Sequence, residues 1–188
     1  MIAAFSSSSS LSSVCLVRET GEVLWSGEEE ASMRASTACL ALLERGLEES
    51  RLSLEDFRLF AADIGPGSFT GVRVGVVLAK TLAWNQGAMC AGVDSFDLVD
   101  AGSTVVLPSR RGEYFVRMVG SDPFRTMQCP EGAVGYGFEG GDRRPMAKGV
   151  SKLVGSLAPV APVELVPHYL IEPSISTSKK PLARIQSG

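Results

Sequence analysis

The sequence predicts an α/β protein, and two observations indicate this class. Short apolar runs that are typical of buried strands alternate with longer segments in which apolar residues recur at helical spacing. Glycine is plentiful, with 20 residues, whereas aromatic residues make up only 7% of the chain. This composition suits tight turns between strands and helices better than an aromatic-rich binding module. A chain of 188 residues has room for one medium domain or two small lobes.

The first half of the chain contains five predicted strands. We expect them over residues 2–5, 14–17, 23–25, 59–62 and 88–91. Residues 6–13 are almost all serine and look like a low-complexity linker. Their position between two strand signals favours a polar hairpin loop instead.

Two helices are predicted between these strands, over residues 32–50 and 70–86. In the second helix, Gly71, Gly75 and Ala79 form a stripe of small residues that allows close approach to a neighbouring element. Leu78 and Leu82 flank the stripe on one side, and Val72, Val76 and Ala83 flank it on the other. Arg73, Lys80 and Trp84 fall on a different face, together with Val77.

The character of the sequence changes after Gly102. Strands are expected over residues 104–107 and 113–119, a glycine-rich stretch over 131–141 and one short helix over 150–157. We therefore expect an N-terminal lobe over 1–102 and a reduced C-terminal lobe over 103–172. Residues 173–188 are rich in Pro, Ser and Lys and read as a disordered or loosely docked tail.

Charge and composition argue against several classes of protein. The net charge is −3, so the chain is a poor independent binder of nucleic acid, and we expect any role with RNA to be indirect. No apolar run approaches the roughly 20 residues of a membrane span, which predicts a soluble protein, and the cysteine usage favours a cytoplasmic one. The four cysteines form no CxxC pair, and Cys15, Cys39 and Cys90 are expected to be reduced thiols in the core.

The motif "DIGPGSFTGVRVG" over residues 63–75 leaves two interpretations open. Glycines that lead into a helix bring backbone N–H groups close to an anion, but they also build a tight turn and a close helix contact. The motif is not a Walker loop, because Gly71 is followed by Val72 and Arg73. It is also neither a serine-hydrolase elbow around Ser68 nor the dinucleotide pattern GxGxxG.

No catalytic set is evident elsewhere in the sequence. His168 is the only histidine, which excludes a two-histidine metal site within one chain and argues against a catalytic triad. The acidic pairs, such as Glu48 with Glu49, read as solvated surface.

The stretch "GPGSFTGVRVGVVLAKTLAW" resembles the signature of the TsaB (YeaZ) family. "IAAFSSSSSLSSVCL" is similar to that family's first hairpin, and "LSLEDFRLFAADIGPGSFTG" to its approach to the motif. "SRRGEYF" and "PHYL" resemble shorter patches of its second lobe. The resemblance covers residues 2–93 well and the second lobe only in patches.

The resemblance implies an actin-like, RNase H-like (ASKHA) two-lobe fold whose second lobe is shortened here. It also implies a non-enzymatic assembly subunit for the formation of N6-threonylcarbamoyladenosine in tRNA. Members of the family support a larger catalytic paralogue, TsaD, and an ATPase, TsaE, joins the assembly. They contact this paralogue through two first-lobe helices, and alone they form homodimers through the same two helices. The implied contact with tRNA is indirect, and no cofactor is expected.

Two departures from the family pattern point away from catalysis. Ser6 stands where the family usually has an aspartate, and Pro108 replaces an acidic residue before the Arg-Arg-Gly-Glu turn. A hydroxyl lacks the charge that holds a metal–nucleotide complex. The glycine motif is therefore expected to be a vestigial phosphate loop, made of Gly65, Gly67, Ser68, Thr70 and Gly71.

The two helices of the first lobe are the expected partner interface. They carry more apolar surface than one sheet face needs, and such excess usually marks an interface. The candidate residues are Leu40, Leu43, Leu47, Val72, Val76 and Leu78. The alternative function from another class is an actin-fold phosphotransferase or ATPase, and a peptidase of the M22 type is a third possibility.

Overall fold

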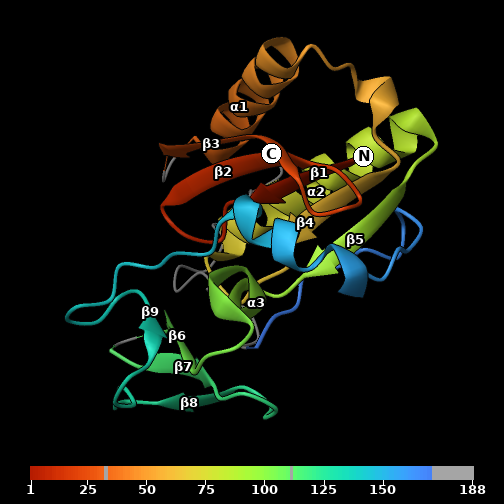
Figure 1. Cartoon of the computed structure of the whole chain (residues 1–188). Helices are drawn as coiled ribbons and strands as arrows, with labels where there is room; N and C mark the ends of the chain where they lie inside the picture. Colours follow the sequence, from red (N-terminus) through yellow and green to blue (C-terminus); the bar gives the residue numbers. More distant parts are fainter. Residues whose placement is uncertain (32–33, 111, 171–188) are drawn as a thin grey trace, which may run out of the picture.

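Two β-sheets organise the chain, one from each half of the sequence (Figure 1). The structure is a computed structural model, and it describes residues 1–31, 34–110 and 112–170. The larger sheet has five strands in the order β3-β2-β1-β4-β5, and the smaller sheet has four in the order β8-β7-β6-β9. The expected tail over residues 173–188 lies outside the described residues.

The five strands predicted for the first half form the larger sheet. They are β1 (Ile2–Ser6), β2 (Leu11–Val17), β3 (Val23–Glu30), β4 (Leu59–Asp63) and β5 (Met89–Val93). The first three are antiparallel neighbours, and β4 and β5 run parallel to β1. The serine-rich stretch is a hairpin connection as expected, although the strands extend into it from both sides and leave only four residues between them.

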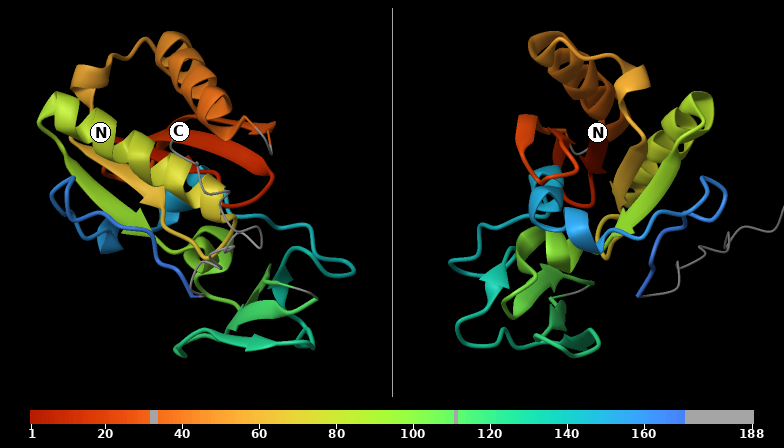
Figure 2. Two further views of the ribbon diagram at one scale, coloured as in Figure 1. Left: turned by 180° about the vertical axis from the view of Figure 1, so that it is seen from behind. Right: turned by 45° about the vertical axis from the view of Figure 1, so that its right-hand side comes forward.

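Both faces of this sheet are covered. Alternate strand residues, such as Phe5 and Phe60, pack beneath α1 (Ala35–Ser50) and α2 (Phe69–Gln86). The other set, such as Ala4 and Ala61, packs against the short helix α3 (Ser95–Asp100) and the 3₁₀ segment η2 (Ala147–Lys152). The left view of Figure 2 shows α1 and α2 together on the near side of the sheet. Strands buried on both faces explain the nearly continuous apolar runs in the sequence.

The smaller sheet follows the short helix α3 (Ser95–Asp100), which the sequence analysis missed. Its strands are β6 (Val105–Pro108), β7 (Tyr114–Arg117), β8 (Phe124–Thr126) and β9 (Val134–Gly135). Phe96 of α3 is fully buried in a small core with Val105, Leu107 and Phe115. The smaller sheet is thus joined to the larger one through α3 (Figure 1).

The chain returns to the larger sheet after residue 146. Ala147 and Val150 are buried against it, and Val160 forms an antiparallel bridge with Cys90 of β5. Two 3₁₀ turns, η2 and η3 (Val154–Ser156), replace the single helix expected over 150–157, a stretch whose Gly155 disfavours helix. The division of the chain at residue 102 remains a prediction.

Among the described residues, no helix combines the length and the apolar character needed to cross a bilayer. The remaining regular element is η1 (Leu54–Asp56), a 3₁₀ turn before β4.

Cys15, Cys39 and Cys90 are buried free thiols, as expected, and burial raises the pKa of Cys15 and of Cys39 to about 11.

Candidate functional site: the serine and glycine loops and the two first-lobe helices

A buried carboxylate, Asp63, occupies the end of β4 beneath the first hairpin. Asp63 is only 1% exposed to solvent. The hydroxyls of Ser6 and Ser8 donate to Oδ2 at 2.7 and 2.6 Å. The Ser95 hydroxyl and the Gly65 N–H donate to Oδ1 at 2.5 and 2.9 Å. Four donors from three separate segments therefore converge on one side chain.

The electrostatics of Asp63 follow from this burial. Loss of hydration disfavours the charged form and raises the pKa of the carboxyl, while the hydrogen bonds from Ser8, Ser95 and Ser6 act in the opposite direction. The oxygens are directed at protein donors inside the core and are closed to solvent. Asp63 therefore links the first hairpin, β4 and α3, in a position where it does not meet a dissolved substrate.

The glycines of the motif have packing partners in the serine loop (residues 7–10). A Cβ atom on Gly71 would lie 1.8 Å from the Ser7 carbonyl oxygen, and one on Gly67 would lie 2.4 Å from that of Ser8. The Ser68 N–H donates to the same Ser8 carbonyl at 2.6 Å. The serine loop thus packs directly on the turn that begins α2, and only residues without a side chain fit there.

The other residues of the predicted phosphate loop lie around this contact. Gly65 is buried and has a φ of +99°, which favours glycine. The Ser68 side chain caps α2 by accepting a hydrogen bond from the Gly71 N–H at 3.3 Å, and Thr70 is exposed. These contacts explain structurally why the motif has glycines and a serine at these positions. Phosphate binding by the motif remains a prediction.

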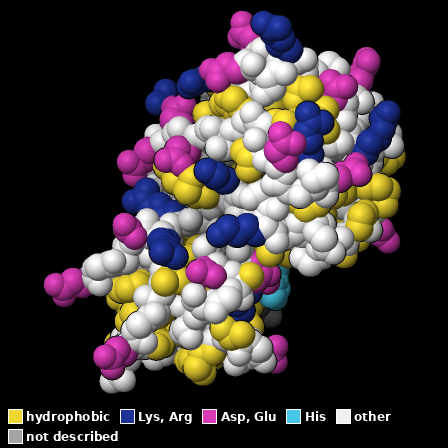
Figure 3. Space-filling view, viewed as in Figure 1, with side chains coloured by type: hydrophobic (Ala, Val, Ile, Leu, Met, Phe, Trp, Pro, Cys, Tyr) yellow, Lys and Arg dark blue, Asp and Glu magenta, His cyan; other side chains and the backbone are white. Residues whose placement is uncertain are grey.

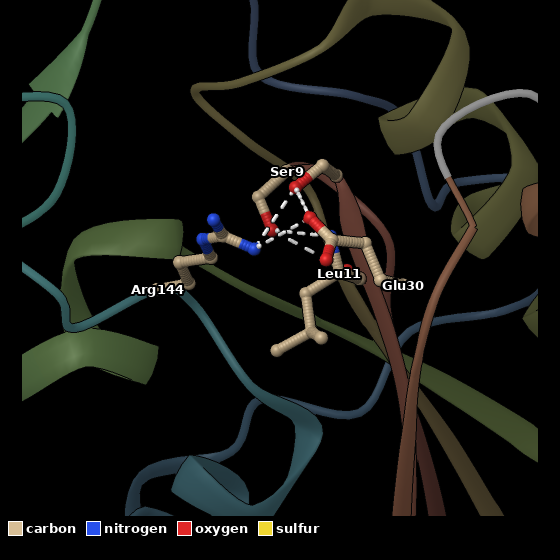
Figure 4. Close-up of polar contacts among 5 residues, drawn as sticks. Ser9, Leu11, Glu30 and Arg144 are labelled. Atoms are coloured by element: carbon tan, nitrogen blue, oxygen red, sulfur yellow. Dashed lines mark hydrogen bonds and ion pairs between the residues drawn. The ribbon is translucent and has the colours of Figure 1, made fainter.

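The serine loop is also tied to the segment between β9 and η2 through Arg144. Its guanidinium donates to the Ser10 hydroxyl at 2.9 Å and lies 3.4 Å from a Glu30 carboxylate oxygen (Figure 4). Ser9 turns back on Leu11 within the loop. The loop is therefore held from both ends, by Asp63 and by Arg144.

A cleft of about 350 Å³ separates the glycine turn from the smaller sheet. Gly67, Pro108 and His168 are among its lining residues. His168 Nδ1 lies 3.5 Å from Asp94 Oδ2, and burial raises the pKa of Asp94. No group of three His, Cys, Asp or Glu side chains within the described residues converges as a metal site.

Charged side chains of both signs alternate over the face that carries η2 (Figure 3). Arg143 pairs with Asp100 at 3.6 Å, as Arg144 does with Glu30. Such a mixed surface offers no single-sign field to a nucleic acid backbone.

The predicted interface residues divide between the core and the surface. Leu43, Val72 and Val76 are only 3%, 2% and 3% exposed, because they point toward the sheet and pack with Phe5 and Phe60 in its core. This corrects the expectation that these three side chains are surplus surface. Leu47 and Leu78 are half-buried, and Leu40 is 44% exposed.

An apolar groove of about 560 Å³ runs between α1 and α2. Leu40 and Leu78, two of the predicted interface residues, line this groove, and its other apolar lining residues were not predicted. The complete lining is Ser36, Leu40, Thr70, Arg73, Val74, Val77, Leu78, Thr81 and Leu82. The helical periodicity puts Val77 on the same face of α2 as Arg73, and this position could have identified Val77 as an exposed interface residue. In the structure, Val77 is 58% exposed.

The chain is similar to proteins of threonylcarbamoyladenosine biosynthesis. A family model described as TsaD, tRNA N6-adenosine threonylcarbamoyltransferase, matches residues 26–104. The tRNA threonylcarbamoyladenosine biosynthesis protein TsaB of Bacillus subtilis (strain 168) is 33% identical over 91 residues. That match covers 45% of this chain and spans 38% of the relative's length.

Two solved structures share the fold along almost their whole length. One is a crystal structure of an uncharacterized protein with similarity to peptidase YEAZ from Pseudomonas aeruginosa, with a TM-score of 0.78. The other is YeaZ from Pseudomonas aeruginosa, with a TM-score of 0.75. Each is 19% identical, and each match covers 90% of this chain and 99% of that structure. The likeness confirms the actin-like, RNase H-like fold class.

Proposed function

Because these comparisons support assignment of the chain to the TsaB (YeaZ) family, we propose that it is a non-enzymatic subunit of the complex that makes N6-threonylcarbamoyladenosine in tRNA. In this role it binds and supports a TsaD-type catalytic paralogue in the cytoplasm. A TsaE-type ATPase joins the assembly, tRNA is contacted only indirectly, and the chain forms a homodimer when it is alone.

The apolar groove between α1 and α2 is the observation that carries this proposal. Val77 and Leu40 are 58% and 44% exposed on its walls, although both are residues that an isolated protein normally buries. An apolar surface of this kind on two adjacent helices fits a partner's helix laid along the groove. Arg73 is the charged residue of the lining.

The loops at the carboxyl ends of β1 and β4 support the non-enzymatic part of the proposal. The serine loop packs directly on the glycine turn at Gly67 and Gly71. The carboxylate of Asp63 has four internal donors and is 1% exposed. Stabilisation of the two loops accounts for these groups without a reaction.

The experiment is a binding measurement with the TsaD-type paralogue from the same genome. The two purified proteins are mixed, and the mass of the complex is measured by light scattering for the wild type and for Val77→Glu. A control variant, Val119→Glu, changes a valine that is 62% exposed in the smaller-sheet region. A carboxylate in an apolar interface costs on the order of 3 kcal/mol, so affinity falls about 100-fold for Val77→Glu alone.

Two results would contradict the proposal. Wild-type protein that forms no complex with the paralogue removes the assembly role. A saturable, magnesium-dependent ATPase activity of the isolated chain, lost in Gly67→Val, supports the phosphotransferase class instead.

A further inference from the structure

A second groove lies on the opposite side of the exposed ridge of α2, between this helix and residues 160–170, which we name the C-terminal strap. Its volume is about 370 Å³. The lining residues are Arg73, Val76, Val77, Lys80, Thr81, Leu165, Val166, Pro167 and Tyr169. Arg73, Val77 and Thr81 line both grooves. The ridge that they form therefore separates two adjoining halves of one surface.

The strap is held in place without any partner. Lys80 Nζ donates to the carbonyl oxygens of Val163 and Leu165 at 3.4 and 3.0 Å. The His168 N–H donates to the Ile64 carbonyl at 2.7 Å. The rings of Phe69 and Tyr169 contact each other at a tilt of 32°, with their centroids 5.0 Å apart. A partner that binds here therefore meets a preformed surface and spends little free energy on ordering it.

The outward side of the strap is apolar and exposed. Val163 is 72% exposed, Val166 62% and Tyr169 40%. Val166 and Tyr169 line the second groove together with Val77, which is 58% exposed on the ridge. Isolated exposed valines need no explanation, but several that continue an apolar groove mark a binding surface.

The charge of the second groove defines the chemistry of its occupant. Arg73 and Lys80 are its charged lining residues, and both are positive. Within the described residues, the lining contributes no carboxylate. The Arg73 guanidinium lies over the Phe69 ring, 5.3 Å from its centroid, and Lys80 bonds backbone carbonyls. An apolar segment that carries a carboxylate complements this groove.

The size of a stable interface favours the use of both grooves. The first groove has nine lining residues, whereas a stable interface involves roughly 20 to 30 residues on each side. The second groove adds six that the first lacks, four of them from the strap. One groove is small for a lasting complex, and the pair comes closer to the usual size.

We propose that the TsaD-type partner straddles α2, with one apolar segment in the α1–α2 groove and a second, carboxylate-bearing segment in the groove between α2 and the strap. This inference rests on the proposed function. It assigns the C-terminal strap as part of the binding surface.

The test measures the affinity for the purified paralogue by calorimetry, using variants at Val166 with matched variants at Val119, which has the same exposed fraction of 62%. Val166→Asp introduces repulsion of the partner's carboxylate and is expected to weaken binding at least about tenfold. Val166→Lys is expected to weaken it clearly less, because the new charge has the opposite sign. Val119→Asp and Val119→Lys are expected to stay within about twofold of the wild type. Circular dichroism confirms that each variant is folded.

The outcomes separate this inference from the proposed function. If the wild type binds, Val77→Glu weakens binding and Val166→Asp does not, the strap lies outside the interface and the inference fails alone. If Val166→Lys weakens binding as much as Val166→Asp, the carboxylate-bearing occupant is refuted. If the wild type does not bind the paralogue but self-associates through Val166, the surface belongs to a second copy of the chain, and both proposals fail.

Discussion

Replacing Asp63 with leucine tests whether the buried carboxylate holds the two loops together. The variant removes the acceptor of four donors, those of Ser6, Ser8, Ser95 and Gly65. The Ser6 hydroxyl retains an alternative acceptor, the Pro145 carbonyl at 3.1 Å. Ser95 can donate to Ser8, since their oxygens are 3.3 Å apart.

Two donors, the Ser8 hydroxyl and the Gly65 N–H, then remain without a partner. Each unsatisfied buried donor costs about 1 to 3 kcal/mol, so the expected loss of unfolding free energy is about 4 kcal/mol. The relief of a buried carboxylate opposes this loss in part. The assay is urea unfolding followed by circular dichroism at neutral pH, with Asp122→Leu as a control at an exposed site. A change below about 1 kcal/mol for Asp63→Leu would refute the linking role.

Three further predictions concern the same packing. Burial raises the pKa of Asp63 from 3.8, so the folded state holds its proton more tightly than the unfolded state. The unfolding free energy of the wild type, relative to that of Asp63→Asn, therefore falls as pH rises from 3.8 through the folded pKa, by up to about 1.4 kcal/mol per pH unit. Urea titrations across this pH window measure both unfolding free energies, and a wild type that gains stability relative to Asp63→Asn as pH rises contradicts the prediction. Gly71→Ala places a Cβ 1.8 Å from the Ser7 carbonyl oxygen and should lower the unfolding free energy by at least about 2 kcal/mol, measured by thermal or urea unfolding. A Cβ at Gly155 would have no neighbour within 4 Å, so the control Gly155→Ala should be nearly neutral. Val76→Glu places a carboxylate at a core site that is 3% exposed, so this variant should unfold the monomer, as judged by circular dichroism. Val77→Glu should leave the monomer folded. A folded Val76→Glu variant would show that α2 is rotated about its axis relative to this structure.

Periodicity predicted much of the first lobe, because its elements have strong local signals. The apolar runs at residues 2–5 and 59–62 correspond to β1 and β4, and the stripe of Gly71, Gly75 and Ala79 is the buried side of α2. A helical pattern alone does not say how far the buried face extends around the stripe. Val72 and Val76 are buried and Val77 is exposed, and this distinction depends on the position of β1 beneath α2.

The Asp63 cluster was not predictable from the sequence. Its hydroxyls come from positions 57, 55 and 32 residues away along the chain. The serine run looks uniform, yet its members have different partners. Ser7 donates to the Gly71 carbonyl at 2.8 Å, and Ser13 accepts from the Ala147 N–H at 2.9 Å. The strap was likewise not predicted, because residues 160–170 lack a periodic pattern and much of their attachment uses backbone groups.

Reconstitution of threonylcarbamoyl transfer tests whether the chain is a non-enzymatic subunit. The TsaD-type and TsaE-type partners from the same genome are supplied with tRNA, ATP and the threonylcarbamoyl donor, with or without this chain, and the modified adenosine is quantified. We expect modification to require the chain, to be lost with Val77→Glu and to persist with Val119→Glu, and we expect no modification by the chain alone. Equal modification in its absence, or modification by the chain alone, would contradict its role as a non-enzymatic subunit.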